Sequence, residues 1–193
     1  MNFGLTDEQE MVVNTVRTFV ENEIYPLEKE VEKTGLVPDE IGQEIKNKVL
    51  KLGFFAPNMP EDVGGGGLDN LSFALLEREL GRGSQGLTIF WGRPSNILLA
   101  CNQEQKEEYL FPAIKGEKFD ALAMTEPGAG SDVRGMKCFA KKDGEDFIIN
   151  GTKHFISHAN IADFVIVFIA TGEEETPKGK KKLITCFLCL LYT

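Results

Sequence analysis

Phe-Asp-Ala-Leu-Ala-Met-Thr-Glu-Pro-Gly-Ala-Gly-Ser-Asp, residues 119–132, is the stretch where the sequence pattern changes. Before it, apolar residues recur at the three- and four-residue spacing of amphipathic helices. After it, short apolar runs alternate with turn residues, as in strands joined by hairpins. Helices followed by strands, without alternating βαβ units, predict an α+β fold and argue against a Rossmann sheet. We expect two domains, a helical one at 1–118 and a β domain at 119–193.

The first domain is predicted to be an all-α helical bundle. Thr6 and Gln9 form a capping box, and Val12, Val16 and Phe19 then fall on one helical face. A second helix is expected to end at Gly53, which tolerates the left-handed conformation common at helix ends. The run Gly64–Gly67 cannot sit inside a stable helix and predicts a loop. Further helices are expected at 71–80 and 103–115, with a kinked or broken one at 86–100 around Pro94.

The second domain is predicted to be an incomplete antiparallel β-barrel. Asp143-Gly144 is a strong hairpin turn signal, and Asn150-Gly151 predicts a second tight turn. Strands are expected at 121–125, 137–141, 147–150, 154–157, 164–170 and 183–191. We expect this domain to have an open sheet edge and uncovered apolar faces, which makes the polypeptide a poor candidate for independent folding.

Charge and composition exclude several classes of protein. The net charge of −9 and the pI of about 4.9 argue against nucleic-acid binding, which requires a basic surface. The acidic run 173–175 and the basic cluster of Lys178, Lys180, Lys181 and Lys182 predict a solvated hairpin. No membrane is expected as a partner, because no run approaches the roughly 20 apolar residues of a membrane span. The N-terminus has neither signal-peptide nor transit-peptide character, so we expect a cytoplasmic protein.

The metal-binding residue types do not suggest a metal site. Cys186 and Cys189 have C-x-x-C spacing but lie in an apolar strand-like run, which favours thiols in the core over zinc or redox chemistry. The two histidines, His154 and His158, cannot hold a metal alone. No metal is therefore expected.

The turn at 125–132 is the main candidate for chemistry. Its glycines allow backbone N–H groups to approach a ligand closely, and Thr125, Ser131 and Asp132 offer polar side chains. It matches neither the dinucleotide-binding motif nor a P-loop, because the glycine spacing differs and no Gly-Lys-Ser/Thr follows. The residues alone leave two interpretations, a polar turn between strands or a ligand-binding loop.

The motif Thr-Glu-Pro-Gly-Ala-Gly-Ser-Asp at 125–132 resembles the corresponding motif of the acyl-CoA dehydrogenase family. The resemblance continues in order along nearly the whole chain, up to Leu188. It is carried by Leu5-Thr6-Asp7-Glu8-Gln9, the glycine loop after Pro60-Glu61, Glu79-Leu80-Gly81-Arg82, Glu104-Gln105-Lys106 with Tyr109-Leu110 and Pro112, Asn150-Gly151-Thr152-Lys153, and Ile161-Ala162-Asp163.

The resemblance implies FAD as the cofactor and assigns residues to it. The flavin-facing residues would be Leu122, Ala123, Met124, Thr125, Gly130 and Ser131, together with Phe155, Ile156 and Ser157. The last three stand where the family has Trp-Ile-Thr, so an aromatic face and a hydroxyl are both kept. Ser131 would also bind the acyl-CoA substrate. His158 stands where the family usually has asparagine. A hydrogen bond that tunes the flavin is one interpretation of it, and a structural role is the one we favour.

The resemblance further implies a flavoprotein oxidoreductase of fatty acid metabolism. Such an enzyme performs α,β-dehydrogenation of acyl-CoA thioesters, passes electrons to an electron-transfer flavoprotein, and is a homotetramer in full length. Family members are nearly twice as long, and the base glutamate lies in a C-terminal part, so we expect no catalytic residue here. Glu126 belongs to the turn motif and is not taken for the base.

Several alternatives stay open. The chain is expected to be an N-terminal fragment, inactive alone, whose apolar end reflects a frameshift, an early stop or a mis-assigned gene end. It could instead be a catalytically inactive remnant or a helical interaction module. A same-fold acyl-CoA oxidase or flavin monooxygenase is the other enzyme candidate. Acyl chain length and branching are not determined by these residues.

Overall fold

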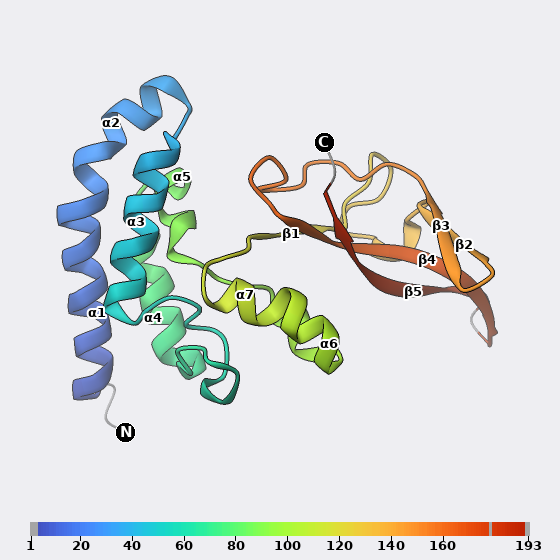
Figure 1. The fold of residues 1–193 in the computed structure, drawn as a ribbon, viewed down its shortest axis with the longest axis horizontal. Coiled ribbons are helices and arrows are strands. Elements are labelled where there is room, and N and C mark those ends of the chain that lie inside the picture. Colours follow the sequence, from blue (N-terminus) through green and yellow to red (C-terminus); the bar gives the residue numbers. More distant parts are fainter. Residues whose placement is uncertain (1–3, 178, 192–193) are drawn as a thin grey trace. The chain divides into compact units, whose positions relative to one another are not determined.

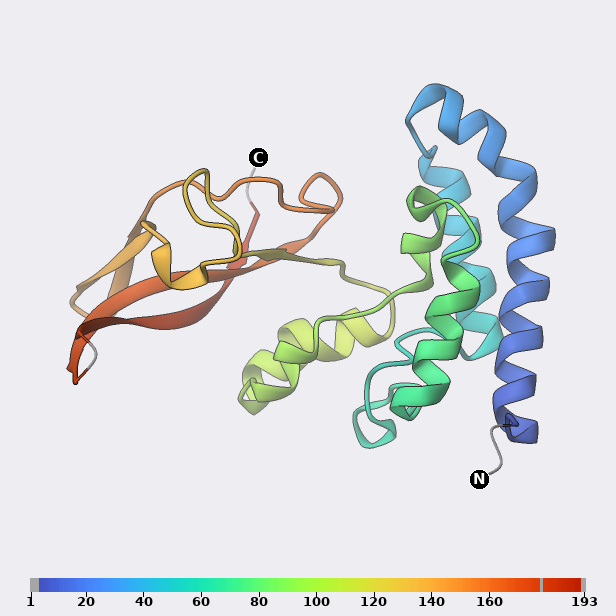
Figure 2. The same cartoon turned by 180° about the vertical axis from the view of Figure 1, so that it is seen from behind.

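The computed structural model describes residues 4–177 and 179–191, in two compact units, 1–117 and 118–193. The first unit is helical and the second is built on a sheet, as Figures 1 and 2 show. The α+β class is thereby confirmed. Lys178, predicted as part of the basic cluster, and the first three and last two residues lie outside the described residues.

The first helix of the chain is interrupted by a π-helical turn. Helix α1 (Asp7–Phe19) begins with the predicted capping box, in which Thr6 and Gln9 bond each other's backbone N–H. It continues through the π turn Val20–Ile24 into α2 (Tyr25–Thr34). Pro26 lies in the first turn of α2, and because proline has no N–H it breaks the regular bonding pattern there. The helix nevertheless continues beyond Pro26, to Thr34.

Helices α3 (Asp39–Leu52) and α4 (Asn70–Leu80) complete the core of the first unit. Gly53 ends α3 with a φ of 74°, as predicted, and Asp69 caps α4 by accepting from two backbone N–H groups. Trp91 is fully buried at the centre of the core, with the ring of Phe19 edge-on at 5.0 Å. The remaining elements are the 3-10 turn Glu61–Val63, α5 (Gln85–Thr88), the 3-10 turns Ile89–Trp91 and Asn96–Ala100, and α6 (Gln103–Gln105) joined by a π turn, Lys106–Leu110, to α7 (Phe111–Ile114).

The glycine run Gly64–Gly67 forms the predicted loop because it wraps closely around a buried side chain. Met59 is fully buried, and its carbonyl accepts from the Gly67 N–H at 2.8 Å. A Cβ on Gly65 would lie 2.3 Å from the Met59 backbone oxygen. Only glycine fits at that position, so the loop is fixed by close packing.

A buried carboxylate joins α1 to α4. The Glu79 side chain is 2% exposed and accepts from Arg17 at 3.0 Å and from Arg78 at 2.7 Å, while Arg82 lies 3.8 Å away. The hydrogen bond from Arg17 lowers the pKa of Glu79 and outweighs the opposing effect of burial. The ion pairs therefore hold two helices that are far apart in sequence.

The second unit is an open, mixed five-stranded sheet. Its strands are β1 (Asp120–Ala123), β2 (Phe139–Asp143), β3 (Asp146–Asn150), β4 (Phe164–Thr176) and β5 (Gly179–Leu190), with a 3-10 turn at Val133–Gly135. Strand β5 pairs with β4 along its whole length. Strand β1 pairs with the start of β4, and β2 meets it further along, at Ala170. Strands β1 and β2 therefore share the other edge of β4.

The prediction of an all-antiparallel sheet is wrong in one respect. The β2–β3 and β4–β5 pairs are antiparallel, but β1 and β2 both run parallel to β4. The cause is the long connection between β3 and β4, residues 151–163. It returns the chain to the end of the sheet at which β1 begins, so that β4 runs in the same direction as β1.

The two hairpins follow their turn and charge signals. Gly144, with a φ of 63°, lies in the two-residue turn between Asp143 and Asp146 that was predicted from sequence. In the β4–β5 hairpin, the acidic run 173–175 pairs residue by residue with lysines 180–182. Glu174 and Lys181, for example, lie 3.0 Å apart on an exposed surface. The described part of this charged segment is the solvated hairpin that was expected.

Three local predictions in the second unit are wrong. Residues 154–157 form a loop instead of a strand, and Gly151 lies in an irregular segment, with a φ of 141°, instead of a tight turn. Both differences arise because this segment bonds to the turn after β1, as described below. Cys186, expected in the core, is exposed, while Cys189 is half-buried.

The sheet leaves apolar surface uncovered, as predicted. In the described residues, the outer edges of β3 and β5 have no partner strand, and Phe139, Ile148 and Leu183 are each more than 40% exposed. Whether the unit folds alone stays a prediction. Within the described ranges, no helix has the length and apolar character to cross a membrane.

The ion pairs of Glu79 with Arg17 and Arg78 should contribute to the stability of the helical unit. Glu79→Gln should lower the free energy of unfolding by about 2–3 kcal/mol, because a buried charged acceptor of arginine hydrogen bonds is lost. Urea unfolding followed by Trp91 fluorescence measures the change. Glu21→Gln is the control: Glu21 lies 3.7 Å from Arg82 but is half exposed, so its effect should stay within about 0.5 kcal/mol. Equal effects of the two substitutions would contradict the importance of burial.

Candidate functional site

The turn after β1 is folded back on itself by the residues of the glycine motif. The Glu126 N–H donates to the Ala129 carbonyl at 2.9 Å, and the Ala129 N–H donates back to the Glu126 carbonyl at 3.2 Å. Ala129 and Met136 are buried in a small apolar cluster with Ala170 of β4. The turn is therefore attached to the sheet, while its glycine-rich tip remains at the surface.

Glu126 is buried at the base of this turn with a full set of donors. One carboxylate oxygen accepts from the Lys153 ammonium at 2.8 Å, and the other accepts from the Lys137 backbone N–H at 2.5 Å. The Cys138 N–H lies 3.1 and 3.2 Å from the two oxygens. The side chains of Glu126 and Lys153 are only 4% and 10% exposed. Such a pair is tolerated in the interior because its polar groups are satisfied.

This environment keeps the carboxylate ionised. Burial by itself would raise the pKa of Glu126, but the hydrogen bonds from Lys153, Lys137 and Cys138 outweigh it and lower the pKa from 4.5 to about 2. The neighbouring thiol behaves in the opposite way, because burial and the Glu126 carboxylate raise the pKa of Cys138. Glu126 is thus an anion at neutral pH, and Cys138 is a neutral thiol next to it.

The loop 151–163 is held against the turn by backbone bonds near its two ends. The His154 N–H donates to the Thr125 carbonyl at 2.8 Å, and the Asp163 N–H donates to the Phe119 carbonyl at 2.8 Å. The Asp163 carboxylate accepts in return from the Phe119 N–H at 2.7 Å. Residues just before and just after β1 therefore fix both ends of the loop.

Gly151 allows the loop to enter this region. Its φ is 141°, and a Cβ there would lie 2.2 Å from the Cys138 sulfur and 2.8 Å from the Cys138 Cα. The Cys138 thiol in turn lies 3.5 Å from the Thr152 carbonyl. The start of the loop and the start of β2 are consequently packed without room for a side chain at position 151.

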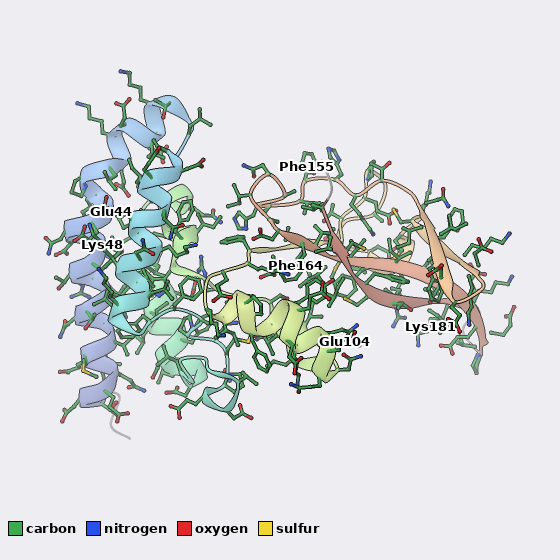
Figure 3. All side chains as sticks on the ribbon, in the orientation of Figure 1. Glu44, Lys48, Glu104, Phe155, Phe164 and Lys181 are labelled. Atoms are coloured by element: carbon green, nitrogen blue, oxygen red, sulfur yellow. The ribbon has the colours of Figure 1, made fainter. Side chains whose placement is uncertain are left out.

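Phe155 is exposed to solvent and has a positive φ, which is rare for a bulky residue. Its side chain is 82% exposed and its φ is 57°, a conformation that a bulky residue adopts only when its surroundings impose it. The ring stacks on His154, with centroids 3.6 Å apart. Figure 3 shows Phe155 on the loop before β4, at a distance from the buried Phe164. Strained backbone and exposed apolar surface are both enriched at binding sites.

The structure brings part of the predicted site together. Met124, Thr125 and Glu126 contact Lys153 and His154, which immediately precede Phe155. The turn after β1 and the aromatic loop are therefore adjacent, as the assignment to one ligand requires. Gly130 and Ser131 lie at the exposed tip of the turn, and in the described residues no hydrogen bond joins them to 155–157.

The predicted residues differ in what they can offer a ligand. Leu122 is 42% exposed, Met124 and Thr125 are half-buried, and Ser157 is exposed. Ala123 is 3% exposed, and Ile156 packs on the cluster formed by Ala121, Ala123 and Val165. Any contact at Ala123 must therefore come from its backbone, and the Ile156 side chain anchors the loop to β1. The open space around Gly130 leaves its backbone accessible.

His158 has the structural setting that the sequence interpretation favours. Its ring lies edge-on to Phe119 at 5.6 Å, and its φ is 67°. Phe119 also carries the backbone bonds to Asp163, so His158 belongs to the closed end of the loop. Its assignment as a structural residue stays a prediction.

Sequence reasoning missed Lys153 and Cys138 as parts of the site. Lys153 was considered only as part of the family motif Asn150-Gly151-Thr152-Lys153, and Cys138 was not considered as a site residue. A signal existed for Lys153, because the carboxylate of Glu126 in an apolar setting requires a cationic partner. No rule of spacing relates positions 126 and 153, so the partner could not be named from sequence.

The family of the chain follows from comparison with known domains. The model described as acyl-CoA dehydrogenase, N-terminal domain, matches residues 6–117, and that for the acyl-CoA dehydrogenase middle domain matches residues 121–190. These two matches cover the helical unit and the sheet unit in order. The chain belongs to the acyl-CoA dehydrogenase family.

Individual relatives agree with this assignment. The chain is 39% identical over 188 residues to 3-(aryl)acrylate reductase of Clostridium sporogenes, covering 95% of the chain and 48% of the relative. It is 34% identical to the caffeyl-CoA reductase-Etf complex subunit CarC of Acetobacterium woodii, covering 90% and 46%. The structure of butyryl-CoA dehydrogenase from Megasphaera elsdenii matches with a TM-score of 0.75 and 30% identity, covering 96% and 50%. The chain thus spans about half the length of these relatives.

The buried carboxylate predicts how acid affects the sheet unit. Because the folded-state pKa of Glu126 is about 2 and its ordinary value is 4.5, its stabilising contribution is present above pH 4.5 and is lost as the pH falls from 4.5 towards 2. The pKa difference corresponds to a contribution on the order of 3 kcal/mol. Glu126→Gln should remove this dependence and lower stability at pH 7.

The measurement is urea unfolding at pH 7, 5, 4 and 3, followed by the NMR amide signals of β4. Glu174→Gln is the control, because it removes a carboxylate from an exposed pair and leaves Glu126 intact. A Glu126→Gln variant that loses stability with acid as steeply as the parent would show that this carboxylate is not responsible.

Proposed function

We propose that this chain binds FAD and an acyl-CoA thioester, as the flavin-facing half of an acyl-CoA dehydrogenase. The observation that carries the proposal is Phe155, an exposed aromatic side chain on a strained backbone, next to the turn motif of the family. Family membership supports FAD as the ligand that covers this ring. FAD supplies the hydride acceptor of the reaction when it is bound.

The residues present fit a flavin ring system. A planar aromatic side chain suits stacking on an isoalloxazine, and Ser157, two residues on, offers an exposed hydroxyl as a hydrogen-bond donor or acceptor. On the turn, Leu122 presents an apolar surface, and the half-buried Thr125 offers a hydroxyl and an N–H. Gly130 adds backbone that a ligand can approach closely.

We assign two substrate roles to this chain: a hydrogen bond from Ser131 and the orientation of the acyl group. Ser131 lies exposed at the tip of the turn and can bond a polar group of the acyl-CoA thioester arm. Dehydrogenation requires the α- and β-carbons to be held in a fixed orientation while negative charge develops on the thioester oxygen. We assign to this chain the orientation of the substrate on one side, through the turn 125–132 and the aromatic loop.

Glu126 is unsuited to remove the α-proton. Its carboxylate is buried, is bonded to three donor residues, and has a pKa of about 2, which makes it a very weak base. The base therefore remains a glutamate expected in a part of the full-length protein beyond these residues. Transfer of electrons to an electron-transfer flavoprotein, a homotetrameric assembly and a cytoplasmic location complete the proposal.

Reduction of an unsaturated acyl group is a second candidate function. Two relatives carry reductase names, one for 3-(aryl)acrylates and one for caffeyl-CoA. The same site serves either direction, because the geometry that removes two hydrogens also delivers them. An acyl-CoA oxidase, a flavin monooxygenase and an inactive remnant are the other outcomes, which anaerobic reduction of the full-length enzyme by acyl-CoA and its reoxidation in air would separate.

FAD binding by the chain tests the proposal directly. Titration of the chain into FAD should quench flavin fluorescence at a saturable site. Phe155→Leu should weaken the affinity roughly three- to tenfold, since one aromatic stacking contact is lost. Phe147→Leu is the control, because Phe147 is an exposed aromatic residue as well but lies on β3, which none of the bonds described above joins to the turn. A chain that never quenches FAD, or equal losses in both variants, would refute the flavin site at Phe155.

Ser131 provides a separate test of the substrate. With FAD bound, Ser131→Ala should weaken binding of a non-reactive acyl-CoA analogue by roughly three- to tenfold, because one hydrogen bond is lost. FAD affinity should change much less, and calorimetry measures both. Ser157→Ala should show the reverse preference. Unchanged analogue affinity in Ser131→Ala would remove this residue from the substrate site.

A further inference from the structure

We propose that the buried pair Glu126–Lys153 is a positioning device that sets the spacing and orientation of the two segments facing the flavin, 122–125 and 154–157. The inference rests on the proposed function, because it assigns the flavin to these segments. It gives a role to two residues that do not themselves face the ligand. The geometry that supports it lies entirely in the sheet unit.

Two bonds in neighbouring positions join the segments. The Lys153 ammonium donates to the Met124 carbonyl at 3.0 Å, and the His154 N–H donates to the Thr125 carbonyl at 2.8 Å. A single hydrogen bond between two loops acts as a pivot, but two bonds at successive residues on both sides fix the orientation as well as the distance. The side chain of Lys153 therefore acts as the second point of attachment.

The Glu126 carboxylate holds the Lys153 ammonium in the position from which it bonds the Met124 carbonyl. Its oxygen holds the Lys153 ammonium at 2.8 Å, while its other bonds reach the backbone at Lys137 and Cys138. One carboxylate thus connects the turn after β1, the aromatic loop and the start of β2. Gly151, packed on Cys138, keeps the loop and β2 in close contact. Movement of any one of the three segments would break a bond to a buried charge.

The Glu126–Lys153 pair fixes the position of the loop more narrowly than apolar side chains in the same place would. Hydrogen bonds to a buried carboxylate have narrow limits of distance and angle, whereas methyl and methylene groups slide past one another with little loss. Replacing the pair with two methionines of similar volume should keep the unit folded and allow the loop to shift. Phe155 lies two residues from Lys153, so its ring orientation would change first.

The experiment compares the parent chain with Glu126→Met/Lys153→Met and with Lys153→Arg, which retains a cation. The control is Glu174→Met/Lys181→Met, which removes an ion pair of similar length from the exposed hairpin. Hydrogen–deuterium exchange is measured on peptides 122–131 and 152–158. FAD affinity and the visible circular dichroism of bound flavin, which reports the asymmetry around the ring, are measured in parallel.

We expect the double methionine variant to remain folded and to exchange its 152–158 amides at least tenfold faster. FAD affinity should fall by about tenfold and the flavin dichroism should change, whereas Lys153→Arg should restore much of both. The control should match the parent in every measurement. A variant that merely lost stability would instead exchange faster throughout the sheet, including β4.

The outcomes separate this inference from the proposed function. If the parent binds FAD and the double methionine variant matches it in affinity, dichroism and 152–158 exchange, the positioning role is overturned and the flavin site stands. If the parent does not bind FAD, the proposed function fails, and with it the flavin role of the pair. In that case unchanged exchange at 152–158 would also overturn the role of the pair in holding the loop.

Discussion

The sheet unit depends on one buried negative charge. The carboxylate of Glu126 accepts hydrogen bonds from the Lys153 ammonium and from the backbone N–H groups of Lys137 and Cys138. The side chains of Glu126 and Lys153 are both almost inaccessible to water. A charge in that position is costly unless every partner is present, so the turn after β1, the loop before β4 and the start of β2 must be assembled together. The interaction therefore couples local structure that is separated by more than twenty residues.

The strained loop at Phe155 is a consequence of this assembly. A bulky residue with a positive φ is unfavourable by itself, and it persists because bonds at Thr125 and Phe119 fix the loop near its ends. The helical unit uses the same principle in a different place, where Glu79 joins α1 to α4 through arginines. In both units a buried carboxylate links segments, but only in the sheet unit does the link lie beside an exposed aromatic ring.

The mixed sheet explains how the site is placed. Strands β1 and β2 lie along the same edge of β4, so the turn that leaves β1 and the strand that it leads to are neighbours. The loop 151–163 must cross back beside that turn to reach the start of β4. The segments 122–125 and 154–157, which we propose to face the flavin, are thus brought together by the order of the strands.

The sequence by itself determined the features that depend on neighbours along the chain. The capping box at Thr6, the helix end at Gly53, the loop at Gly64–Gly67 and the hairpin at Asp143-Gly144 are local, and each was predicted correctly. The turn motif was also recognisable, because its residues are contiguous. The strand expected at 154–157 was wrong because its backbone bonds across the chain to Thr125.

Only the tertiary structure decided the contacts between distant segments. The pairing of Glu126 with Lys153, the parallel placement of β1 and β2, and the exposure of Phe155 all depend on which segments meet in space. No residue spacing encodes such meetings, since the chain between them can take many paths. The residues alone thus indicated the family and the local elements, while the fold determined that the buried charge and the exposed ring lie on adjacent segments.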